Sequence, residues 1–315
     1  MEKQSQKADT NYVGVDVSKA GLDVCLDGAR THSITNNANG HAQLVAMLHR
    51  MANPRVVCEA TGGYEASMVA ALMQAGLEVC VVNPQRVRAF AKANGWLAKT
   101  DKLDAKLLRQ FGISIDPRLE HPCSQSARDL REMLEYRRAI SDQLVAMTNR
   151  CELAGKTLRT HLEKTIAMLK DSLNEINALI ENHISGDAGL SAKRDRMREL
   201  CGVGPVLAAT LLAYVPEIGE VPPEQLSSLV GVAPYACDSG PHKGKRFIRG
   251  GRKMVRHVLF MGAVAAARHN VVLKRFYEGL IARGKAKKVA IVAVMRKMLH
   301  VISRLLTDTN FVLVR

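Results

Sequence analysis

Long apolar runs and aromatic residues are both scarce in this chain of 315 residues. No stretch reaches the roughly 18 uncharged apolar residues that a transmembrane helix needs. The N-terminal sequence MEKQSQKADTN also lacks the apolar core of a signal peptide. Phe, Trp and Tyr make up only 4% of the chain, yet 47% of its residues are apolar, which is enough for buried cores. We therefore expect a cytoplasmic protein with no membrane partner.

Closely spaced cysteine pairs are absent as well. The cysteines are odd in number and scattered, without a C-x-x-C pair that would indicate a zinc site or a disulfide framework. We expect them to be reduced and mostly buried, as small apolar side chains are. They are Cys25, Cys58, Cys80, Cys123, Cys151, Cys201 and Cys237.

Acidic residues are nearly missing from the last quarter of the chain. Residues 240–315 contain 18 Lys and Arg but only Glu278 and Asp308 as acids, whereas the preceding residues carry a net charge of −1. The formal net charge of +15 is therefore a C-terminal property. Such a charge favours a polyanionic partner, because binding releases counterions. Acidic proteins and membrane surfaces are polyanions too, but the chain has no membrane segment.

The first part of the chain predicts an α/β domain. Short β-branched segments separated by turn residues indicate strands at 12–17, 22–26, 32–35, 55–58 and 77–82. Helical spacing is found at 41–51, 64–76 and 97–112. Strands that begin as a meander and then alternate with helices indicate a mixed sheet. We place this domain at residues 1–122.

The next segment is helical throughout. Residues 125–184 contain no proline, and their apolar residues recur at steps of three and four. One continuous helix would be about 90 Å long at 1.5 Å per residue. An antiparallel hairpin, broken near 154–155 or near 160–161, fits the pattern equally well. We expect a helical coiled-coil spacer at residues 123–190.

The last part of the chain, residues 191–315, predicts a helical domain. Two helices joined by Gly202-Val203-Gly204-Pro205 have the layout of a helix-hairpin-helix. Glycines in that motif let backbone N–H groups approach a phosphate, so Gly202 and Gly204 are candidate nucleic-acid contacts. A plain turn between two helices is the alternative. Two or three basic helices, at 252–269, 271–283 and 285–306, close the chain.

Four carboxylates have positions that suit metal chemistry. Asp16 lies within a strand, where an ionised side chain is costly unless it is paired or metal-bound. Glu59 ends a later strand, and Asp101 and Asp104 share one face of a predicted helix. Taken singly, Asp16 could turn outward, Glu59 could cap a helix, and the Asp pair could be a solvated face. Together they match the donor set of a ribonuclease-H-like fold, which holds two divalent ions for phosphoryl transfer. Oxygen donors suit Mg²⁺ or Mn²⁺.

Ser239 lies in the stretch CDSGPHKGK, directly before a dense basic run. It is a candidate loop residue, phosphate contact or nucleophile. A serine nucleophile must be activated by a base or a metal site, and His242 is the nearest histidine. The basic side chains are candidate phosphate contacts, with a solvated basic face as the alternative. They are Lys19, Lys243, Lys245, Arg246, Arg249, Arg252, Lys253 and Arg256.

Several motifs resemble the insertion-sequence 110 family of transposases, the DEDD transposases related to the Piv DNA invertases. The resemblance covers nearly the whole chain from about Tyr12, with the motifs in the family's order. In the first half they are GVDVSK at 14–19, CEATGGY at 58–64, Asn83-Pro84 and TDKLDA at 100–105. In the second half they are GVGPVLAATLLAYVPEIG at 202–219, Ser239-Gly240, RGGRKMVRHVLFMGAVAAARHN at 249–270 and RGKAKKVAIVAVMRKML at 283–299.

The resemblance implies a RuvC-like domain at 1–122, a coiled-coil spacer at 123–190 and a C-terminal transposase domain at 191–315. It makes Asp16, Glu59, Asp101 and Asp104 a metal-binding tetrad for two Mg²⁺ ions, which Mn²⁺ can replace. It makes Ser239 the nucleophile, through a phosphoserine intermediate. One departure is local: many relatives have Asn after the glycine where this chain has Gly251, so one expected polar contact is absent.

The resemblance also implies the partners. They are donor and target DNA, a structured guide RNA encoded by the element, and further copies of the chain, assembled as dimers and tetramers. The implied location is a prokaryotic cytoplasm, with nucleoid association when the protein is bound to DNA. One alternative function is a RuvC-like Mg²⁺-dependent nuclease or junction resolvase without a covalent intermediate. The other is a non-catalytic nucleic-acid-binding protein, against which the four carboxylates weigh.

Overall fold

The computed structural model describes residues 10–96, 101–121, 124–239, 244 and 246–313, and the side chains of all of these except 101–103. By its internal contacts the chain divides into two compact units, Met1–Pro122 and Cys123–Arg315. The separation of a spacer from a C-terminal domain at residue 190 stays a prediction.

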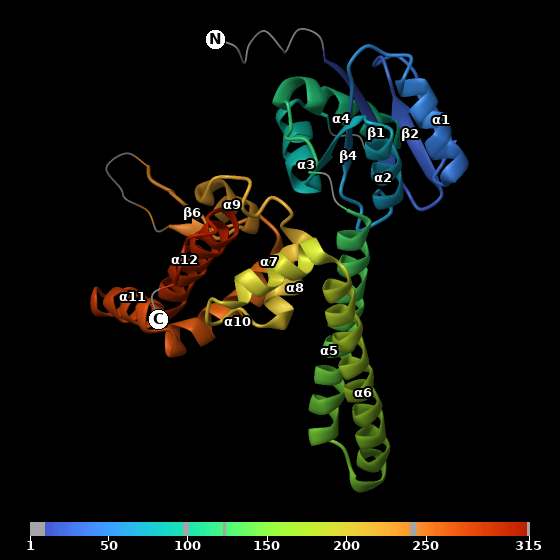
Figure 1. Ribbon diagram of the computed structural model, residues 1–315. Coiled ribbons are helices and arrows are strands. Elements are labelled where there is room, and N and C mark those ends of the chain that lie inside the picture. The colour runs from blue at the N-terminus through green and yellow to red at the C-terminus, as the bar shows by residue number, and fades with distance from the viewer. Residues whose placement is uncertain (1–9, 97–100, 122–123, 240–243, 245, 314–315) are drawn as a thin grey trace. The chain divides into compact units, whose positions relative to one another are not determined.

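A five-stranded mixed sheet forms the centre of the first unit (Figure 1). Its order is β3-β2-β1-β4-β5, with antiparallel pairing of β1, β2 and β3 and parallel pairing of β1, β4 and β5. The strands are β1 (Asn11–Val17), β2 (Gly21–Cys25), β3 (Thr31–Thr35), β4 (Pro54–Glu59) and β5 (Glu78–Val82). The predicted mixed sheet is confirmed, and it is consistent with an α/β fold of the RuvC-like kind.

Helices cover both faces of this sheet. Apolar residues of α1 (Ala38–Leu48) and α2 (Ala66–Gln74) pack on one face, and those of α3 (Pro84–Ala93) and α4 (Asp101–Ile115) pack on the other. The sequence reading did not predict α3. The predicted strand ends just before Pro84, which opens this helix at a position where proline is well tolerated, and the Asn83 side chain accepts a hydrogen bond from the Gln85 amide.

The second unit begins with a long antiparallel helix pair, α5 (Gln125–Glu152) and α6 (Lys156–Gly186), visible as the green arm in Figure 1. The chain reverses over residues 153–155, where Leu153 is 91% exposed. The hairpin broken near 154–155 is therefore confirmed over the other two possibilities. The first half of α5 and the last half of α6 contribute buried residues, such as Leu134 and Ile180, to one apolar core. The helices that follow contribute to the same core.

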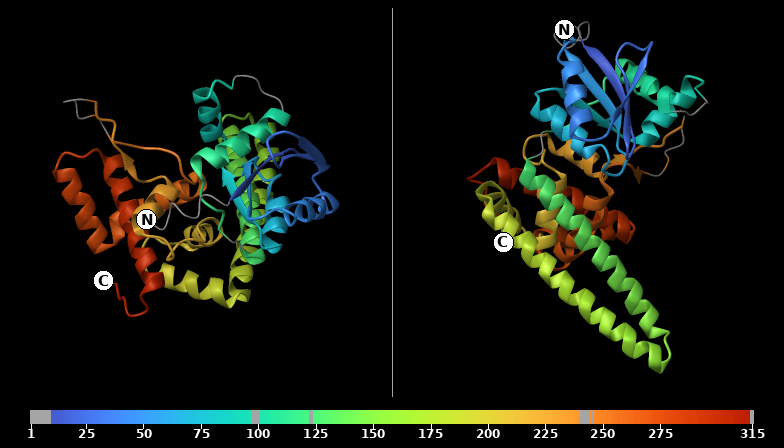
Figure 2. Two further views of the ribbon diagram at one scale, coloured as in Figure 1. Left: turned by 90° about the horizontal axis from the view of Figure 1, so that it is seen from above. Right: turned by 90° about the vertical axis from the view of Figure 1, so that its right-hand side faces the viewer.

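Shorter helices complete the second unit around one apolar core, seen from two further directions in Figure 2. They are α7 (Ala188–Arg198), α8 (Pro205–Tyr214), α9 (Pro223–Val230), α10 (Lys253–His269), α11 (Val271–Ala282) and α12 (Lys287–Thr307). A two-stranded sheet of β6 (Pro234–Tyr235) and β7 (Phe247–Ile248) lies between α9 and α10 in the sequence. The last three helices agree with the predicted basic helices to within two residues.

The glycines of the predicted helix-hairpin-helix have different surroundings. A Cβ at Gly202 would lie 2.5 Å from the carbonyl oxygen of Gly262 and 2.8 Å from the Cβ of Ala266, both on α10. Gly202 therefore allows two backbone segments to touch, and it also has a φ of 96°. Gly204 precedes α8, is exposed, and has open space around its Cβ position. Contact of either glycine with nucleic acid stays a prediction.

All the described cysteines are free. Cys25, Cys58 and Cys80 are buried in the first unit, but Cys201 and Cys237 are exposed, so the expectation of burial was wrong for these two. Among the helices of the described residues, none combines the length and apolar character that crossing a bilayer requires.

Candidate active site

The alternation of side chains along the central strands decides which face of the sheet each carboxylate occupies. On β1, Val15 and Val17 belong to the core formed with α1 and α2. Asp16 lies between them and therefore projects to the opposite face, which α4 covers. On β4, Cys58 belongs to the same α1 and α2 core. Glu59 is the next residue, so it shares the face of Asp16, and both side chains are partly buried.

The register of the parallel strands brings these two carboxylates to neighbouring positions. Val15 on β1 is aligned with Cys58 on β4, so the next positions along the two strands are Asp16 and Glu59. Neighbouring strands lie about 4.8 Å apart. The two carboxylates thus share one face at the carboxyl ends of β1 and β4.

Helix α4 runs in the direction opposite to β1. Its early residue Ala105 lies beside Gly14, and its late residue Gly112 lies beside Tyr12, which comes earlier in β1. A Cβ at Gly14 would be 2.0 Å from the carbonyl oxygen of Ala105 and 2.5 Å from the amide nitrogen of Arg109. Glycine at this position is what allows the helix backbone to lie directly on the strand.

This direction carries the N-terminal end of α4 toward the carboxyl ends of the strands. Asp104 precedes Ala105 and is partly buried, and Asp101 is the first residue of the helix. The side chain of Asp101 lies outside the described residues. Three of the four predicted carboxylates, Asp16, Glu59 and Asp104, are therefore positioned toward the same end of one face of the sheet.

The donor chemistry of this region suits a divalent metal ion, because carboxylate oxygens are the ligands that Mg²⁺ and Mn²⁺ prefer. The described side chains do not form a finished coordination shell. Among them, no three His, Cys, Asp or Glu side chains are grouped closely enough to hold a metal ion. Asp16, Glu59 and Asp104 thus suit a metal ion in donor type and lie toward one end of one face, but these three described side chains are not grouped as a metal-binding cluster in this structure.

One acidic residue near these carboxylates was missed by the sequence reading. Asp23 on β2 is aligned directly with Asp16 across the antiparallel pair, and aligned residues project to the same face. It accepts a hydrogen bond from Ser33 on β3. Like charges directly opposite each other destabilise a sheet. A bound cation at this end of the face would offset that repulsion. Only the strand register, which the sequence pattern does not fix, could have revealed this neighbour.

A polar network fixes the other end of α4. The Tyr12 hydroxyl donates to the carboxylate of Asp116 at 2.6 Å, and Arg55 donates to the same carboxylate at 2.9 Å. Arg55 also donates to Glu78 at 2.7 Å. Burial, together with the hydrogen bond to Asp116, raises the pKa of Tyr12 to about 12. The network ties the residue that follows α4 to β1, β4 and β5, and it thereby helps to position the helix.

The loop after β4 is organised by a carboxylate of its own. Glu65 accepts hydrogen bonds from the Thr61 amide at 3.1 Å, the Thr61 hydroxyl at 2.7 Å and the Gly63 amide at 2.9 Å. Burial alone would raise the pKa of Glu65, but these hydrogen bonds lower it below its usual value. Glu65 is also the N-cap residue of α2, so the loop that it organises leads directly into this helix.

Ser239 lies in the second unit, on the connection between β6 and β7. It is exposed, and the five residues 240–243 and 245 of the same connection lie outside the described ones. The two sides of this connection approach each other closely at Gly244, because a Cβ there would be 2.0 Å from the carbonyl oxygen of Cys237. The Arg249 guanidinium lies over the ring of Tyr235, 5.4 Å from its centroid, and adds a cation–π contact where the β6 and β7 strands pair.

An ion pair next to Ser239 holds the hairpin closed. Arg246 donates to both oxygens of Asp238, at 2.5 and 2.9 Å, and the Gly244 amide donates to Asp238 at 3.0 Å. The hydrogen-bonded Arg246 guanidinium keeps the pKa of Asp238 below its usual value. Asp238 was not singled out from the sequence, because its partner is eight residues away across a connection of no regular pattern.

The predicted phosphate contacts of this unit differ in how much of their charge is used within the chain. Arg252 donates to both carboxylate oxygens of the buried Glu217, at 2.7 and 2.6 Å. Arg256 donates to the carbonyl oxygen of Gly250. Lys253 is exposed at the start of α10. Contacts of these side chains with nucleic acid stay predictions.

Three more of the predicted phosphate contacts are lysines. Lys19 is exposed on the turn between β1 and β2, three residues beyond Asp16. Lys243 and Lys245 lie outside the described residues, as does His242.

Family models match both units of the chain. An IS110-type DEDD transposase model, described as Transposase, matches residues 13–161. A model described as Transposase IS116/IS110/IS902 family matches residues 194–278. These ranges include Asp16, Glu59, helix α4 and Ser239.

Two relatives align with the chain over nearly its full length. Two proteins named Pilin gene-inverting protein, from Moraxella lacunata and Moraxella bovis, are each 28% identical to the chain over 301 residues. These alignments cover 92% of this chain and 94% of each relative. The Insertion element IS110 uncharacterized 43.6 kDa protein of Streptomyces coelicolor is 29% identical over 139 residues, 44% of this chain and 32% of that protein. Together with the two family models, which confirm the motif resemblance, these matches establish that the chain belongs to the IS110 family of transposases.

Proposed function

We propose that this transposase cuts and rejoins DNA with catalytic groups from both of its units, the carboxylates of the first and Ser239 of the second. As a transposase, it acts on DNA. The observation that carries the proposal is the common placement of Asp16, Glu59 and the N-terminal end of α4 on one face of the sheet. The gene inversion for which its two Moraxella relatives are named favours strand exchange over simple hydrolysis.

The carboxylates would hold two divalent metal ions. Asp16, Glu59, Asp101 and Asp104 are the proposed ligands, with Mg²⁺ as the natural ion and Mn²⁺ as a substitute. When bound, such ions polarise the scissile phosphate and stabilise the attacking and leaving oxygens. The alignment of Asp23 with Asp16 supports this proposal, because it adds negative charge where a cation would be bound.

Ser239 would be the nucleophile. Its hydroxyl oxygen attacks the phosphorus, a Ser Oγ–P bond forms, and the bond from phosphorus to the 3′ oxygen breaks. The hydroxyl proton is released as the bond forms, and the departing 3′ oxygen takes up a proton. The product is a phosphoserine link and a free 3′-hydroxyl. Because the link conserves the phosphodiester energy, a second DNA end can attack it and restore Ser239 without ATP.

The guide RNA and the assembly belong to the same proposal. A structured RNA from the element would choose donor and target sequences, since phosphate contacts by themselves fix position but not sequence. Dimers that assemble into tetramers would bring the carboxylates of one copy to Ser239 of another. The resemblance to the family supports both statements, and the C-terminal excess of positive charge supports a nucleic-acid partner.

The test is the formation of a covalent protein–DNA adduct. Purified protein, RNA transcribed from the element's flank, labelled DNA and Mg²⁺ are incubated, then denatured and separated. We expect an adduct with the wild type and with Ser228→Ala, a matched exposed serine on α9, but not with Ser239→Ala. Asp104→Asn should lose the adduct and keep RNA binding, whereas Asp171→Asn, an exposed carboxylate on α6, should keep both.

Two outcomes would contradict the proposal. Cleavage by Ser239→Ala without any adduct would favour a metal-dependent nuclease or resolvase, in which the serine has no covalent role. Adduct formation in EDTA at the wild-type rate would exclude the metal site.

A further inference from the structure

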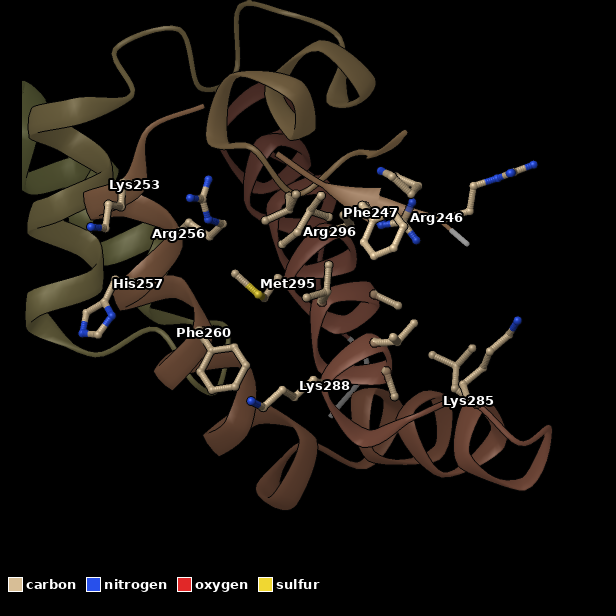
Figure 3. A pocket seen from close by; sticks show the side chains of 18 of the residues that line it. Arg246, Phe247, Lys253, Arg256, His257, Phe260, Lys285, Lys288, Met295 and Arg296 are labelled. Carbon is tan, nitrogen blue, oxygen red and sulfur yellow. The ribbon is translucent and has the colours of Figure 1, made fainter. Parts of the chain in front are cut away.

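A cavity of about 770 Å³ in the second unit has no assigned role. Its walls come mainly from α10, α12 and the β6–β7 hairpin that carries Ser239 (Figure 3), and Arg138 of α5 and Leu280 of α11 also line it. The volume is within the range of roughly 300–1,000 Å³ that is typical of ligand pockets.

The rim of this cavity is strongly basic. Of the described residues that line it, none is acidic, and seven are Lys or Arg. Some of these are already engaged, as Arg246 is with Asp238. In the described part of the chain, Lys253, Lys285 and Lys288 have no ion-pair partner, so their charge is available to a ligand. A polyanion is therefore the complementary partner.

One partly buried cation of the lining has a donor atom without a partner among the described residues. Arg296, on α12, has an Nε atom that is buried and without a hydrogen-bond acceptor among the described residues. Buried donors without partners are rare in proteins, because they lose hydrogen bonds to water and gain nothing in return. The side chain lines the cavity, where a ligand oxygen could accept this hydrogen bond.

The interior of the cavity is apolar and includes aromatic rings. Phe260 from α10 and Phe247 from β7 line it together with Met295 from α12 (Figure 3). Phe247 is 59% exposed, so its ring is accessible to a ligand. Aromatic faces next to a basic rim are the combination that binds the bases and phosphates of a single strand.

We propose that this cavity binds an unpaired nucleotide of a single-stranded DNA or RNA segment. The base packs against Phe247 and Phe260, and the phosphate lies against Lys288 and Arg296. A double helix does not suit the site, because its bases are stacked on one another and do not offer their faces to the protein. The inference deepens the proposed function by naming the form of nucleic acid, and it requires neither Ser239 chemistry nor a bound metal.

The test measures equilibrium binding of the full-length chain to fluorescent oligonucleotides in EDTA. The probes are a single-stranded DNA, an RNA of the same sequence, the matching DNA duplex, and a DNA strand whose central bases are removed. We expect tighter binding of one or both single strands than of the strand without bases, and the comparison of DNA with RNA identifies the natural ligand. Phe247→Ala and Phe260→Leu should each weaken single-strand binding about 5- to 150-fold, the equivalent of one lost stack. Duplex binding should stay unchanged.

The contribution of the cavity's positive charge to binding is tested with two adjacent lysines of α12. Lys288 lines the cavity, whereas Lys287 is exposed outside it. Lys288→Gln should weaken single-strand binding and reduce the slope of log K against log salt by about 0.7. Lys287→Gln should have a smaller effect. Melting temperatures of all variants confirm that they are folded.

Three results of the binding experiments would overturn the inference. They are equal losses for the two lysine variants, single-strand affinity that is insensitive to both phenylalanine changes, or equal affinity for strands with and without bases. A change in oligomeric state of Phe247→Ala without nucleic acid would also overturn it, because the cavity would then be covered by a second copy of the chain. Loss of DNA cleavage with intact single-strand binding would contradict the proposed function but not this site.

Discussion

Replacement of Gly14 by alanine tests whether α4 really lies on the strand that carries Asp16. The added Cβ would be 2.0 Å from the carbonyl oxygen of Ala105, and Cβ contacts under 3.0 Å essentially do not occur. The backbone of α4 must therefore move by about 1 Å or more, and Asp104 must move with it. The contact is with backbone atoms, so a change of side-chain rotamer cannot relieve it.

Overpacking determines the expected loss of stability, and displacement of Asp104 determines the expected loss of cleavage rate. Inserting a methyl group into a tightly packed core costs about 1–3 kcal/mol. For a unit of this size, each kcal/mol lowers the melting temperature by roughly 3–6 °C. A misplacement of about 1 Å at a catalytic centre reduces the rate roughly 100-fold. We expect Gly14→Ala to remain folded with a lower melting temperature, and its rate of DNA cleavage to fall roughly 100-fold.

Gly21→Ala is the matched control, because a Cβ there would meet its nearest atom, the carbonyl oxygen of Ile34, at an ordinary 3.5 Å. Thermal melting and metal-dependent DNA cleavage are measured for both variants. If Gly14→Ala melts and cleaves like Gly21→Ala, the helix does not lie on β1 as described. The shared placement of the carboxylates would then fall with it.

Three further predictions concern individual interactions. Arg252→Met should destabilise the second unit by about 3 kcal/mol, measured by urea unfolding, because it removes a cationic partner from Glu217, whose side chain is only 3% exposed. The pKa of Asp238 is lowered by Arg246, so their attraction is fully present at neutral pH and is lost as the pH falls below the usual carboxylate range of about 4. Hydrogen exchange of the hairpin should therefore rise on acidification, and Asp238→Asn should exchange fast at every pH. The raised pKa of Tyr12 stabilises the fold at pH values below about 10, and this contribution disappears as the pH rises toward 12, so Tyr12→Phe should flatten the alkaline loss of stability.

Local sequence signals predicted most of the secondary structure. Strands of five to seven residues with β-branched side chains were found because burial on two faces demands such residues. The helix pair α5 and α6 was recognised from apolar spacing, but its break at 153–155 was not decided, because short turns between long helices leave little trace. Helix α3 was missed because a proline can either end or begin a helix, and only the context of Asn83 distinguishes the two.

The sequence predicted the residues of the candidate site but not their arrangement in space. The types of residue in the motifs indicated Asp16, Glu59, Asp104 and Ser239. The face that Asp16, Glu59 and Asp104 share depends on strand register and on a close approach at Gly14, which are properties of packing. The ion pair that closes the Ser239 hairpin lies on the connection between two strands of two residues each, which are too short for any periodicity. The basic cavity combines residues of α5, α10, α11 and α12, which no local pattern connects.

The most direct test of the central claim is to locate the covalent link. The adduct formed with Mg²⁺ is digested with protease and nuclease, and the modified peptide is sequenced by mass spectrometry. We predict a nucleotide phosphate on Ser239, absent when Asp16→Asn or EDTA removes the metal site. A link on another residue, or DNA rejoining with no link at all, would contradict the account.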